Sequence, residues 1–559
     1  MADEDTPAFA TRSIYVNLKA KPLTNICINH LCERSEANEE ILSQPLISDI
    51  RSVSSYNWLA VDAGVTATPT IQVPGILSPI FCALIIYGCI RRLQADMELV
   101  MAGAPPVVTF PDTELLHLRP DSGHHFIDQN AARTNDRGMV PGLAACHAYR
   151  RTFNVQDYDI ITDRNNLIKL FELVASSESP VDDLDDLFLV PRDPRGPEAG
   201  RDWRGRGGGG PGGGSSNFPR RGRGGRYRGR PRNGYRGMNP AMSRRPETSR
   251  IDIDVVSGYD HTKGTYTYDP SAASQTLILT RWEPQSEEII VPESDFRGFG
   301  YSFLSATRQF LSVGADGEMM ERSAADVTGF HCLVEYKLFG KRLLVRYHAD
   351  GCDMDKKQFT NWSMGKGMRG SSGDGEDEDD EEEEETDTFD LLDAFKTLNV
   401  AGDKLQESKP LDEKPDEKPT TKVPVQVVRE SLPDIPLDIV NTPNVVFPHS
   451  RLLQVKTRGR YAGLDRAKLH MQLFFSQTSQ AYVAYHVSGK FPRSDARRED
   501  VTDGVKEWGE KNSKSLAHLI GLLEKVREAV VGVGGKAAVL LLPPAVAEEG
   551  NSLAVHQRR

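Results

Sequence analysis

Two short stretches of the sequence carry polar groups that could perform chemistry on a phosphodiester. Residues 341–350 (KRLLVRYHAD) and residues 451–460 (RLLQVKTRGR) alternate apolar and polar side chains with the period of a strand. The first stretch ends in Asp350, and the second contains Lys456. An aspartate can hold Mg²⁺ or Mn²⁺, and a lysine can steady the attacking water or the developing charge. On neighbouring strands, Asp350 and Lys456 are candidate catalytic residues, and Asp350 is a candidate metal ligand.

Few carboxylates accompany this pair. A Mg²⁺ ion prefers several hard oxygen ligands, and two-metal hydrolysis needs acids that are shared between the ions. The residues two positions before Asp350 and Lys456 are His348 and Gln454, and neither is an acid. The pattern therefore favours a site that binds nucleic acid and is catalytically weak or inactive. Mg²⁺ or Mn²⁺ is expected as a cofactor only if the site is active.

Residues 201–237 differ sharply in composition, with 11 arginines, 14 glycines and one acid. Such a segment cannot bury a core, and its composition predicts disorder. Arginine pairs with phosphates and stacks on bases, so the segment predicts RNA binding without sequence specificity. A flexible linker is the alternative, although glycine and serine alone would suffice for that role. The RNA-binding candidates here are Arg204, Arg206, Arg220, Arg221, Arg223, Arg226 and Arg228.

A second biased segment is acidic. Residues 374–387 hold 12 acids in 14 positions, and residues 389–398 (FDLLDAFKTL) have the pattern of a short amphipathic helix. The helix is a candidate docking motif for a protein partner, and the acidic tract is another. The tract could also compete with RNA for the arginine-rich segment, or simply keep the chain soluble.

Composition divides the chain into folded and disordered parts. Hydrophobic residues make up 38% of the chain, which has 48 glycines, 34 prolines and a formal net charge of −12. The most apolar run, residues 80–90, is shorter than the roughly 20 residues that span a bilayer, so no membrane segment is expected. Seven scattered cysteines indicate an intracellular protein, in the nucleus or the cytoplasm. The expected divisions are a weakly structured segment (1–50), an α/β lobe (51–190), a disordered RGG-rich segment (191–248), the first half of a core (249–365), a disordered acidic insertion (366–425) and the second half of the core (426–559).

The segments that must position Asp350 and Lys456 predict alternating strands and helices. Residues 329–350 predict a hairpin that turns at residues 339–341, and residues 452–456 predict a further strand. Residues 481–489 and 537–542 also predict strands, the latter being the last of the chain. The predicted fold is α/β (α+β), a mixed β-sheet flanked by helices with long disordered insertions. Helices are expected over residues 165–176, 296–310, 465–475 and 513–531.

Five short motifs follow one another between residues 251 and 545. They are Gly300-Tyr301-Ser302-Phe303-Leu304, His348-Ala349-Asp350, Gln454-Val455-Lys456-Thr457, Lys468-Leu469 with Gln472-Leu473-Phe474-Phe475, and Ala484-Tyr485-His486 before Gly489. In order and strand context they resemble the decapping exonuclease (DXO/RAI-type) family of PD-(D/E)xK enzymes. The pieces SSYNWL, PTIQVPG, FIDQNAAR and DIITDRNNL are similar to those of fungal proteins that share this C-terminal region.

The resemblance implies a PD-(D/E)xK nuclease-like fold and an activity that removes aberrant or non-canonical caps from RNA 5′ ends and degrades the RNA. Three metal-binding carboxylates of the family's motifs are replaced in this chain by Leu304, His348 and Gln454. Of the metal ligands and the lysine, Asp350 and Lys456 remain. Phosphate contacts along an RNA channel are implied for Lys456, Arg458, Arg460, Lys468 and Gln472.

Three functions are compatible with the sequence. The lost carboxylates and the arginine-rich segment favour an RNA-binding, decapping-nuclease-like protein that is weak or inactive in catalysis. An active metal-dependent decapping enzyme or 5′–3′ exonuclease with a rearranged metal site is the first alternative. A protein-interaction scaffold that uses the RGG-rich and acidic tracts is the second.

Overall fold

The computed structural model describes residues 17–19, 21–28, 35–59, 70–74, 105–134, 137–178, 249–292, 298–313, 319–322, 327–355, 357–359, 428–432, 437–442, 447–542 and 551–558. The arginine-rich segment, the acidic tract and residues 389–398 lie outside the described residues, so the interpretations of these segments stay predictions. None of the helices in the ranges given above is long and apolar enough to cross a membrane.

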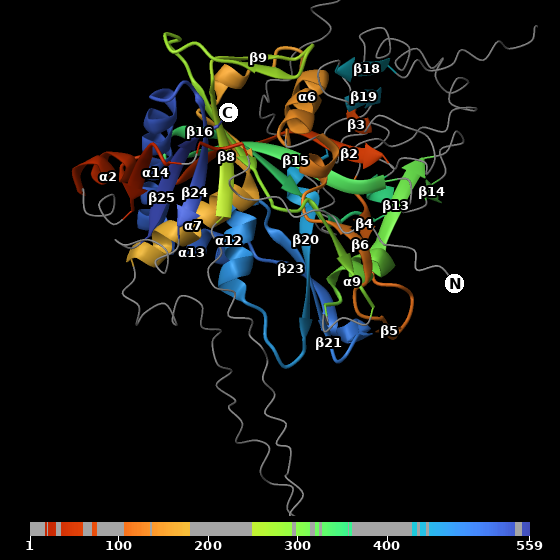
Figure 1. Ribbon diagram of the computed structural model, residues 1–559. Helices are drawn as coiled ribbons and strands as arrows, with labels where there is room; N and C mark the ends of the chain where they lie inside the picture. Colours follow the sequence, from red (N-terminus) through yellow and green to blue (C-terminus); the bar gives the residue numbers. More distant parts are fainter. Residues whose placement is uncertain are drawn as a thin grey trace, which may run out of the picture.

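Within these residues, twelve strands form one mixed sheet that dominates the fold (Figure 1). From edge to edge the strands are β1 (Thr24–Cys27), β25 (Ser552–Gln557), β24 (Lys536–Leu542), β8 (Ser249–Val256), β11 (Thr276–Arg281), β7 (Ile160–Asp163), β16 (Lys341–His348), β15 (Val327–Leu338), β2 (Ile47–Leu59), β3 (Thr70–Pro74), β19 (Leu437–Thr442) and β18 (Val428–Leu432). Strand β7 pairs parallel with both of its neighbours, β11 and β16. This parallel pairing brings the ends of β7 and β16 to the same edge of the sheet.

A second sheet of seven described strands lies beside the first. Its order is β14 (Met319–Arg322), β13 (Arg308–Val313), β4 (Val107–Val108), β17 (Gly351–Cys352), β20 (Leu452–Gly459), β21 (Gln480–His486) and β23 (Ala496–Asp500). Three two-stranded ribbons complete the described strands: β9 (Gly258–Asp260) with β10 (Thr265–Thr267), β6 (Gly123–Phe126) with β12 (Glu287–Ile290), and β5 (Leu115–His117) with β22 (Lys490–Pro492).

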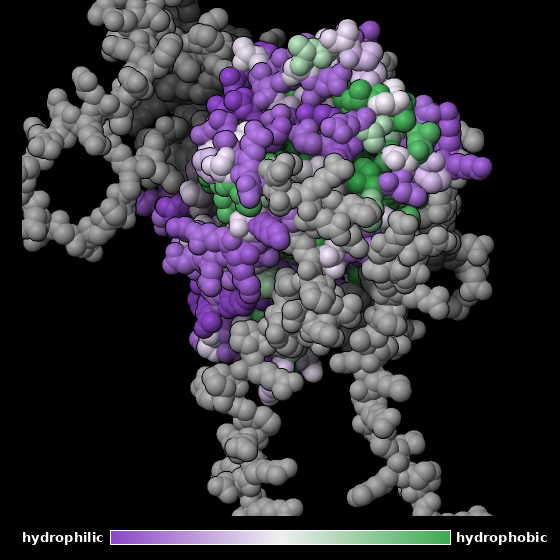
Figure 2. Space-filling view, turned by 90° about the vertical axis from the view of Figure 1, so that its left-hand side faces the viewer, coloured by the Kyte–Doolittle hydropathy of each residue, from purple (hydrophilic) through white to green (hydrophobic). Residues whose placement is uncertain are grey.

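Helices cover both faces of the twelve-stranded sheet (Figure 1). One face packs against α7 (Arg164–Glu178), α12 (Arg466–Ser476) and α14 (Ser513–Val531), and the other packs against α6 (Val140–Tyr149). The side of the molecule drawn in Figure 2 is mostly hydrophilic over its coloured residues, as expected for helices that bury one side. The other described α-helices are α2 (Ser35–Leu42), α5 (Gln129–Thr134), α9 (Gly300–Thr307) and α13 (Thr502–Lys511).

Strand β16 explains why both faces need cover. Successive side chains of a strand point to opposite faces of the sheet. Leu343 and Val345 belong to the core with α7 and α14, whereas Leu344 belongs to the core with α6, and all three are fully buried. The predicted alternation is confirmed. The predicted hairpin is confirmed as well, because β15 and β16 pair along their length and turn at Phe339 and Gly340.

Two predicted elements are wrong at their ends. The helix expected over residues 296–310 is α9, which ends at Thr307, and β13 begins at Arg308. Arg308 is extended because it pairs with Val108 of β4, a long-range contact that helical periodicity cannot reveal. Strand β24 is not the last strand, because β25 follows and pairs with it antiparallel.

Strands from distant parts of the chain interleave in the large sheet. Strand β2 pairs with β15, and β7 lies between β11 and β16. The ranges 51–190, 249–365 and 426–559 therefore all contribute strands to one sheet. The predicted mixed sheet flanked by helices is confirmed, and its two-sided burial places the ends of β7 and β16 at the site described next.

Candidate functional site at the junction of the two sheets

Asp350 lies where the chain leaves one sheet and enters the other. Strand β16 ends at His348 in the twelve-stranded sheet, and β17 begins at Gly351 in the seven-stranded sheet. Strand β17 then pairs antiparallel with β20, which carries Lys456. The expectation that the strands over 341–350 and 451–460 are neighbours is therefore wrong, because β16 and β20 belong to different sheets. The strand beside Asp350 that pairs with β20 is β17, which begins just after that residue.

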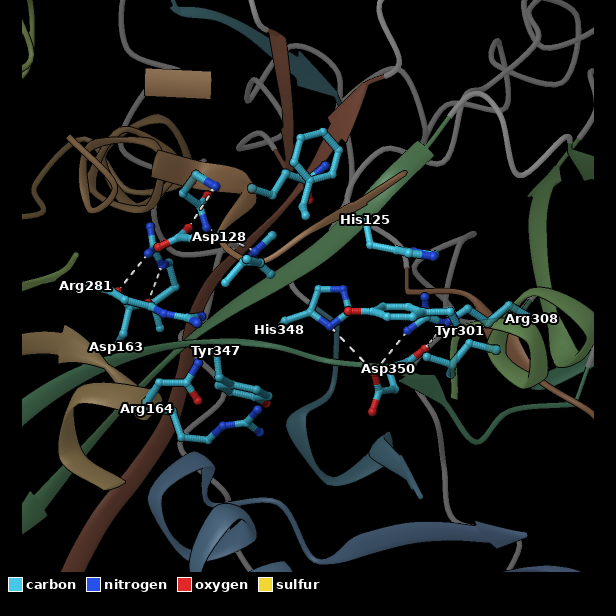
Figure 3. Close-up of a pocket in the computed structure, with 18 of the residues that line it drawn as sticks. His125, Asp128, Asp163, Arg164, Arg281, Tyr301, Arg308, Tyr347, His348 and Asp350 are labelled. Atoms are coloured by element: carbon cyan, nitrogen blue, oxygen red, sulfur yellow. Dashed lines mark hydrogen bonds and ion pairs between the residues drawn. The ribbon is translucent and has the colours of Figure 1, made fainter. Parts of the chain in front are cut away.

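Both carboxylate oxygens of Asp350 are bonded. Figure 3 shows its contacts with Arg308 and His348. Arg308 Nη2 lies 3.1 Å from Oδ1, and Arg308 Nε donates to the backbone carbonyl of Asp350 at 2.6 Å. The backbone N–H of Val455 donates to Oδ2 at 2.9 Å. His348 Nδ1 lies 3.6 Å from Oδ1. Asp350 thus ties β13 and β20 to the end of β16.

These contacts keep Asp350 charged. Burial by itself raises the pKa of this carboxyl. The hydrogen bond from His348 and the charges of Arg308 and Lys456 lower the pKa by more than burial raises it, so the net pKa lies well below its usual range. Burial lowers the pKa of the Arg308 guanidinium, and the charge of Asp350 opposes that shift. A cation that approached this carboxylate would be repelled by the guanidinium of Arg308 beside Oδ1.

Lys456 is half buried in a group of cations near Asp350. Burial lowers its pKa to about 8, the charge of Asp350 opposes this shift, and the charges of Arg164, Lys468 and Arg458 add to it. At pH 7 the Lys456 side chain is therefore mostly in its protonated, ammonium form. A cluster of positive charge from α7, α12 and β20 attracts phosphate and repels metal ions.

A cavity of about 600 Å³ opens beside Asp350 and is lined by residues of both sheets (Figure 3). Three of its lining side chains are the guanidinium groups of Arg164, Arg281 and Arg308. Arg164 begins α7, and its Nε and Nη1 are buried with no hydrogen-bond partner within the described residues. Its guanidinium carbon lies 5.8 Å from the centre of the Tyr347 ring. A buried guanidinium with unused donors is a ready partner for an anion.

A second aspartate–arginine pair lines the same cavity. Arg346 on β16 donates to Asp163 at the end of β7, from Nε to Oδ1 at 2.7 Å and from Nη2 to Oδ2 at 2.8 Å. Its Nη1 also donates to the backbone carbonyl of Gly138, just before α6. Burial alone would lower the pKa of Arg346, but the charge of Asp163 raises it above its usual value. Burial raises the pKa of Asp163, and the charge and hydrogen bonds of Arg346 oppose that shift. The pair is a two-point support between β7, β16 and α6.

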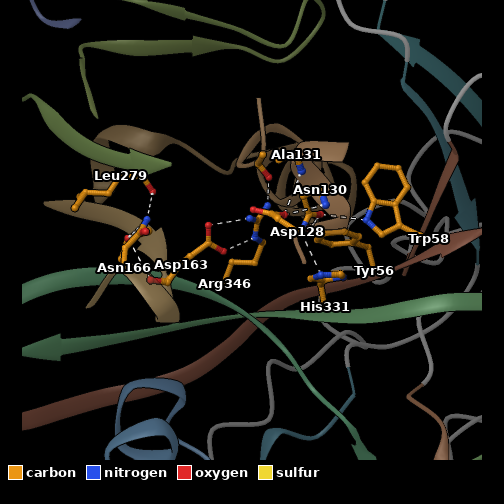
Figure 4. Close-up of polar contacts among 12 residues, drawn as sticks. Tyr56, Trp58, Asp128, Asn130, Ala131, Asp163, Asn166, Leu279, His331 and Arg346 are labelled. Atoms are coloured by element: carbon orange, nitrogen blue, oxygen red, sulfur yellow. Dashed lines mark hydrogen bonds and ion pairs between the residues drawn. The ribbon is translucent and has the colours of Figure 1, made fainter. Parts of the chain in front are cut away.

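Asn130 connects two aromatic side chains to a histidine in the cavity wall (Figure 4). Its side-chain oxygen accepts hydrogen bonds from Tyr56 Oη at 2.6 Å and from Trp58 Nε1 at 3.1 Å. Its side-chain nitrogen lies 3.1 Å from Nε2 of His331. Asp128 caps the start of α5, because its Oδ1 accepts the backbone N–H groups of Asn130 and the next residue, at 3.0 and 3.1 Å.

Aromatic rings stand at the more open part of the cavity. Tyr301 of α9 is 40% exposed and stacks on His125 of β6, with ring centres 3.8 Å apart. His348 meets His331 edge to face at 5.4 Å. These rings offer surfaces on which a planar ligand could stack.

The side chains present do not fit the divalent metal that the resemblance implies. In the part of the chain that the structure describes, no three His, Cys, Asp or Glu side chains are grouped to hold such an ion. Leu304 lines the cavity, and Gln454 Nε2 donates to the backbone carbonyl of His348 at 3.0 Å. Asp350 has both oxygens committed to protein donors.

Among the RNA-binding candidates of β20 and α12, Lys456 interacts with Asp350. Arg458 and Lys468 are exposed, and their charges act on Lys456. Gln472 is half buried, and its Oε1 has no hydrogen-bond partner within the described residues. Arg460 lies 3.5 Å from Asp495. RNA contact by these side chains stays a prediction, as does contact by the arginines of residues 201–237, which lie outside the described residues.

Several residues of the cavity were not predicted as site residues from the sequence. Arg164 follows a strand-like run at the start of a predicted helix, and that position was a usable signal for an anion-binding side chain. Arg308 gives no such signal, because the predicted helix extends across it. Arg281, Asp128 and His331 are brought to the cavity by β11, α5 and β15, which only the sheet topology places together.

No family model matches this chain, and no curated protein matches its sequence. Several solved structures are similar to it. Rai1 of S. pombe in complex with 3′-FADP has 10% identity and a TM-score of 0.34, over 92% of this chain and 95% of that chain. Rai1 of Scheffersomyces stipitis in complex with (3′-NADP)+ and calcium ion has 8% identity and a TM-score of 0.38, over 95% and 93%. Rai1 of Candida albicans in complex with pU5-Mn2+ has 8% identity and a TM-score of 0.34, over 92% of each chain. TM-scores this low assign neither a family nor an activity to this chain.

Proposed function

We propose that this chain is an RNA-binding protein with a decapping-nuclease-like architecture, which receives an RNA 5′ end in the cavity beside Asp350 and cleaves it weakly or not at all. The ion pair between Asp350 and Arg308 carries this proposal. Metal-dependent hydrolysis needs several carboxylate ligands, and here Asp350 already pairs with a guanidinium at one oxygen and with a backbone N–H at the other.

The charge of the cavity supports a nucleic acid as its ligand. Arg164, Arg281 and Arg308 line it, and Lys456 and Arg458 extend the positive charge along β20. Alternate residues of a strand share one face and lie about 6.6 Å apart, so the two β20 cations form a short row. Such a row contacts phosphates without reading sequence.

An active phosphodiester hydrolase is a second candidate function. One observation favours it: Lys456 has a pKa of about 8 and its charge acts on Asp350, so a proton could leave this lysine near neutral pH. The weakness of this candidate is that the described residues contain no group of three His, Cys, Asp or Glu side chains that could hold a metal ion.

Equilibrium RNA binding tests the first candidate. A 5′-phosphorylated ten-nucleotide RNA, followed by fluorescence anisotropy, should bind with an affinity that falls as salt rises, because phosphate contacts release counterions. Lys456→Ala and Arg164→Ala should each lower the slope of log affinity against log salt by about 1. Lys506→Ala, at an exposed position of α13, is the matched control and should change nothing. Binding that ignores salt, or no binding, contradicts the proposal.

Cleavage separates the two candidates. Purified full-length protein is incubated with capped and with 5′-phosphorylated RNA in Mg²⁺ or Mn²⁺, and the products are resolved on a gel. We expect no metal-dependent products. Hydrolysis that Asp350→Ala abolishes would establish the hydrolase instead.

The scaffold function suggested by the RGG-rich and acidic tracts rests on segments outside the described residues. Deleting residues 201–237 addresses it. If the cavity is the principal RNA site, the deletion lowers affinity and leaves the effect of Lys456→Ala intact. Loss of all RNA binding on deletion would move the function to the arginine-rich segment.

A further inference from the structure

Two buried polar atoms in the cavity wall have no hydrogen-bond partner within the described residues. They are Oδ2 of Asp128 and Nδ1 of His331. The two residues are 5% and 6% exposed. Buried polar atoms are nearly always bonded to protein, water or ligand, so a pair of unbonded atoms around one cavity indicates a partner that occupies it.

The hydrogen bonds of Asn130 settle where His331 carries its proton. The Asn130 oxygen is the group that accepts from Tyr56 and Trp58, so the nitrogen that faces His331 Nε2 is a donor. Nε2 must then accept, which leaves the ring proton on Nδ1. Burial lowers the pKa of His331 well below its usual value, so the ring stays neutral. His331 therefore presents one N–H donor.

Asp128 presents the complementary acceptor. Its Oδ1 is occupied by the backbone N–H groups at the start of α5, which leaves Oδ2. The charge of Asp128 acts on Arg281 and Arg346 and also on the neighbouring carboxylate of Asp163. Asn130 fixes both groups, because its backbone N–H bonds Asp128 and its side chain bonds His331. One residue thus sets the relative position of a donor and an acceptor.

We propose that Asp128 and His331 read the edge of the 5′-terminal base and select the lactam edge of guanine or uracil. This inference rests on the proposed function. In a lactam, a ring N–H stands beside a carbonyl: the N–H donates to Asp128 Oδ2, and the carbonyl accepts from His331 Nδ1–H. Adenine and cytosine also offer a donor, the amino group, beside an acceptor, the bare ring nitrogen. The selection therefore rests on strength, because the lactam N–H is more acidic than the amino N–H and forms the stronger hydrogen bond to the carboxylate.

The rest of the cavity suits a nucleotide. Its volume of about 600 Å³ lies within the range of small-molecule sites, roughly 300–1,000 Å³. Tyr301, stacked on His125, offers an aromatic face for a base, and Arg164 offers unused donors for a phosphate. The cavity therefore combines a phosphate contact, a stacking surface and two groups that can read a base edge.

A panel of four 5′-phosphorylated decamers that differ only in the first nucleotide tests this proposal by fluorescence anisotropy. The full-length protein should bind 5′-guanosine and 5′-uridine RNAs about tenfold more tightly than 5′-adenosine and 5′-cytidine RNAs. A 5′-terminal N3-methyluridine RNA should lose the advantage of uridine, because the methyl group replaces the lactam hydrogen. This arm needs no change in the protein.

Asp128→Asn is the matched variant. An asparagine oxygen still caps α5, and its nitrogen turns the acceptor that faces the base into a donor. The preference for guanosine and uridine should disappear, whereas Asp112→Asn, at an exposed site paired with Arg493, should keep it. Equal affinity for all four RNAs and for N3-methyluridine overturns this inference and means that water alone satisfies the two atoms. Absence of any RNA binding overturns the proposed function itself, so the two failures are distinct.

Discussion

The cavity holds two aspartate–arginine pairs that differ in how completely they are bonded. Arg346 meets both oxygens of Asp163, at 2.7 and 2.8 Å. Arg308 meets one oxygen of Asp350, at 3.1 Å, and uses its Nε on the backbone carbonyl of that residue. The side chain of Arg346 is 2% exposed, and that of Arg308 is 18% exposed.

This difference indicates that one pair supports the fold and that the other can contact a ligand. A two-point pair that water cannot reach fixes the side chains of β7 and β16 and leaves few donors for a ligand. The pair at the sheet junction is partly open, so a phosphate could share the guanidinium of Arg308 without breaking the fold. The same two residue types therefore serve stability at Asp163 and ligand contact at Asp350.

Removing Arg346 should produce the largest effect. Arg346→Met leaves Asp163 buried without its partner, and we expect the free energy of unfolding to fall by about 3–5 kcal/mol. Urea unfolding followed by circular dichroism measures this. Arg342→Met, on the same strand but half exposed, should change the free energy by less than about 0.5 kcal/mol. The double variant Asp163→Leu with Arg346→Met should recover most of the loss, and equal losses in both single arginine variants would erase the contrast.

Asp350→Ala should cost less, about 2–3 kcal/mol, because the Arg308 left behind can still reach the cavity. The stabilisation by Asp350 should also depend on pH. The pKa of Asp350 is lower in the folded than in the unfolded protein, so its stabilisation is present above the unfolded pKa of about 3.9 and is lost as pH falls through the folded pKa. Unfolding measured between pH 5 and pH 3 should therefore show a shallower pH dependence in Asp350→Ala than in the wild type. An unchanged slope would mean that Asp350 is not stabilised as the ion pair requires.

Lys456 should make RNA binding depend on pH to a moderate degree. Its folded pKa of about 8 means that the phosphate-binding ammonium is lost between pH 7 and pH 9, so affinity should fall by a few-fold. Lys456→Arg should abolish that part of the dependence, because arginine stays charged. Protein stability moves oppositely: the unfolded lysine keeps its proton to about pH 10.4, so the burial cost of the charge is relieved as pH rises from 8 to 10. Anisotropy at constant ionic strength measures the binding, and a flat wild-type profile would contradict this role.

Adding carboxylates around Asp350 should have the smallest effect. A triple variant with Leu304→Glu, His348→Glu and Gln454→Glu adds acids around Asp350, and we expect weak Mn²⁺ binding, on the order of millimolar, measured by calorimetry. The wild type should show none at this site. If Asp350→Ala removes Mn²⁺ binding that the wild type already has, the ion pair with Arg308 does not exclude a metal.

The sequence by itself determined the elements around the site. The alternation of Leu343, Val345 and Tyr347 with Leu344, Arg346 and His348 predicts a strand, and the structure has that strand. Its burial on both faces is a finding of the structure. The helices over 165–176, 465–475 and 513–531 follow from apolar spacing and correspond to α7, α12 and α14. Local periodicity suffices in these cases because the buried side of each element is continuous along the chain. The replacement of three expected acids by Leu304, His348 and Gln454 was also readable without coordinates.

Only the tertiary structure decided what surrounds Asp350. Arg308 reaches it because β13 pairs with β4 and not with a local segment, and sequence periodicity carries no information about such long-range pairing. The cavity brings together side chains from β11, α5 and β15, whose proximity depends on the order of strands in the sheet. Asp128 and His331 become a donor and acceptor pair only through Asn130, which binds them both. Side-chain identity is fixed by the sequence, but the partner of a buried charge is fixed by the way distant strands meet.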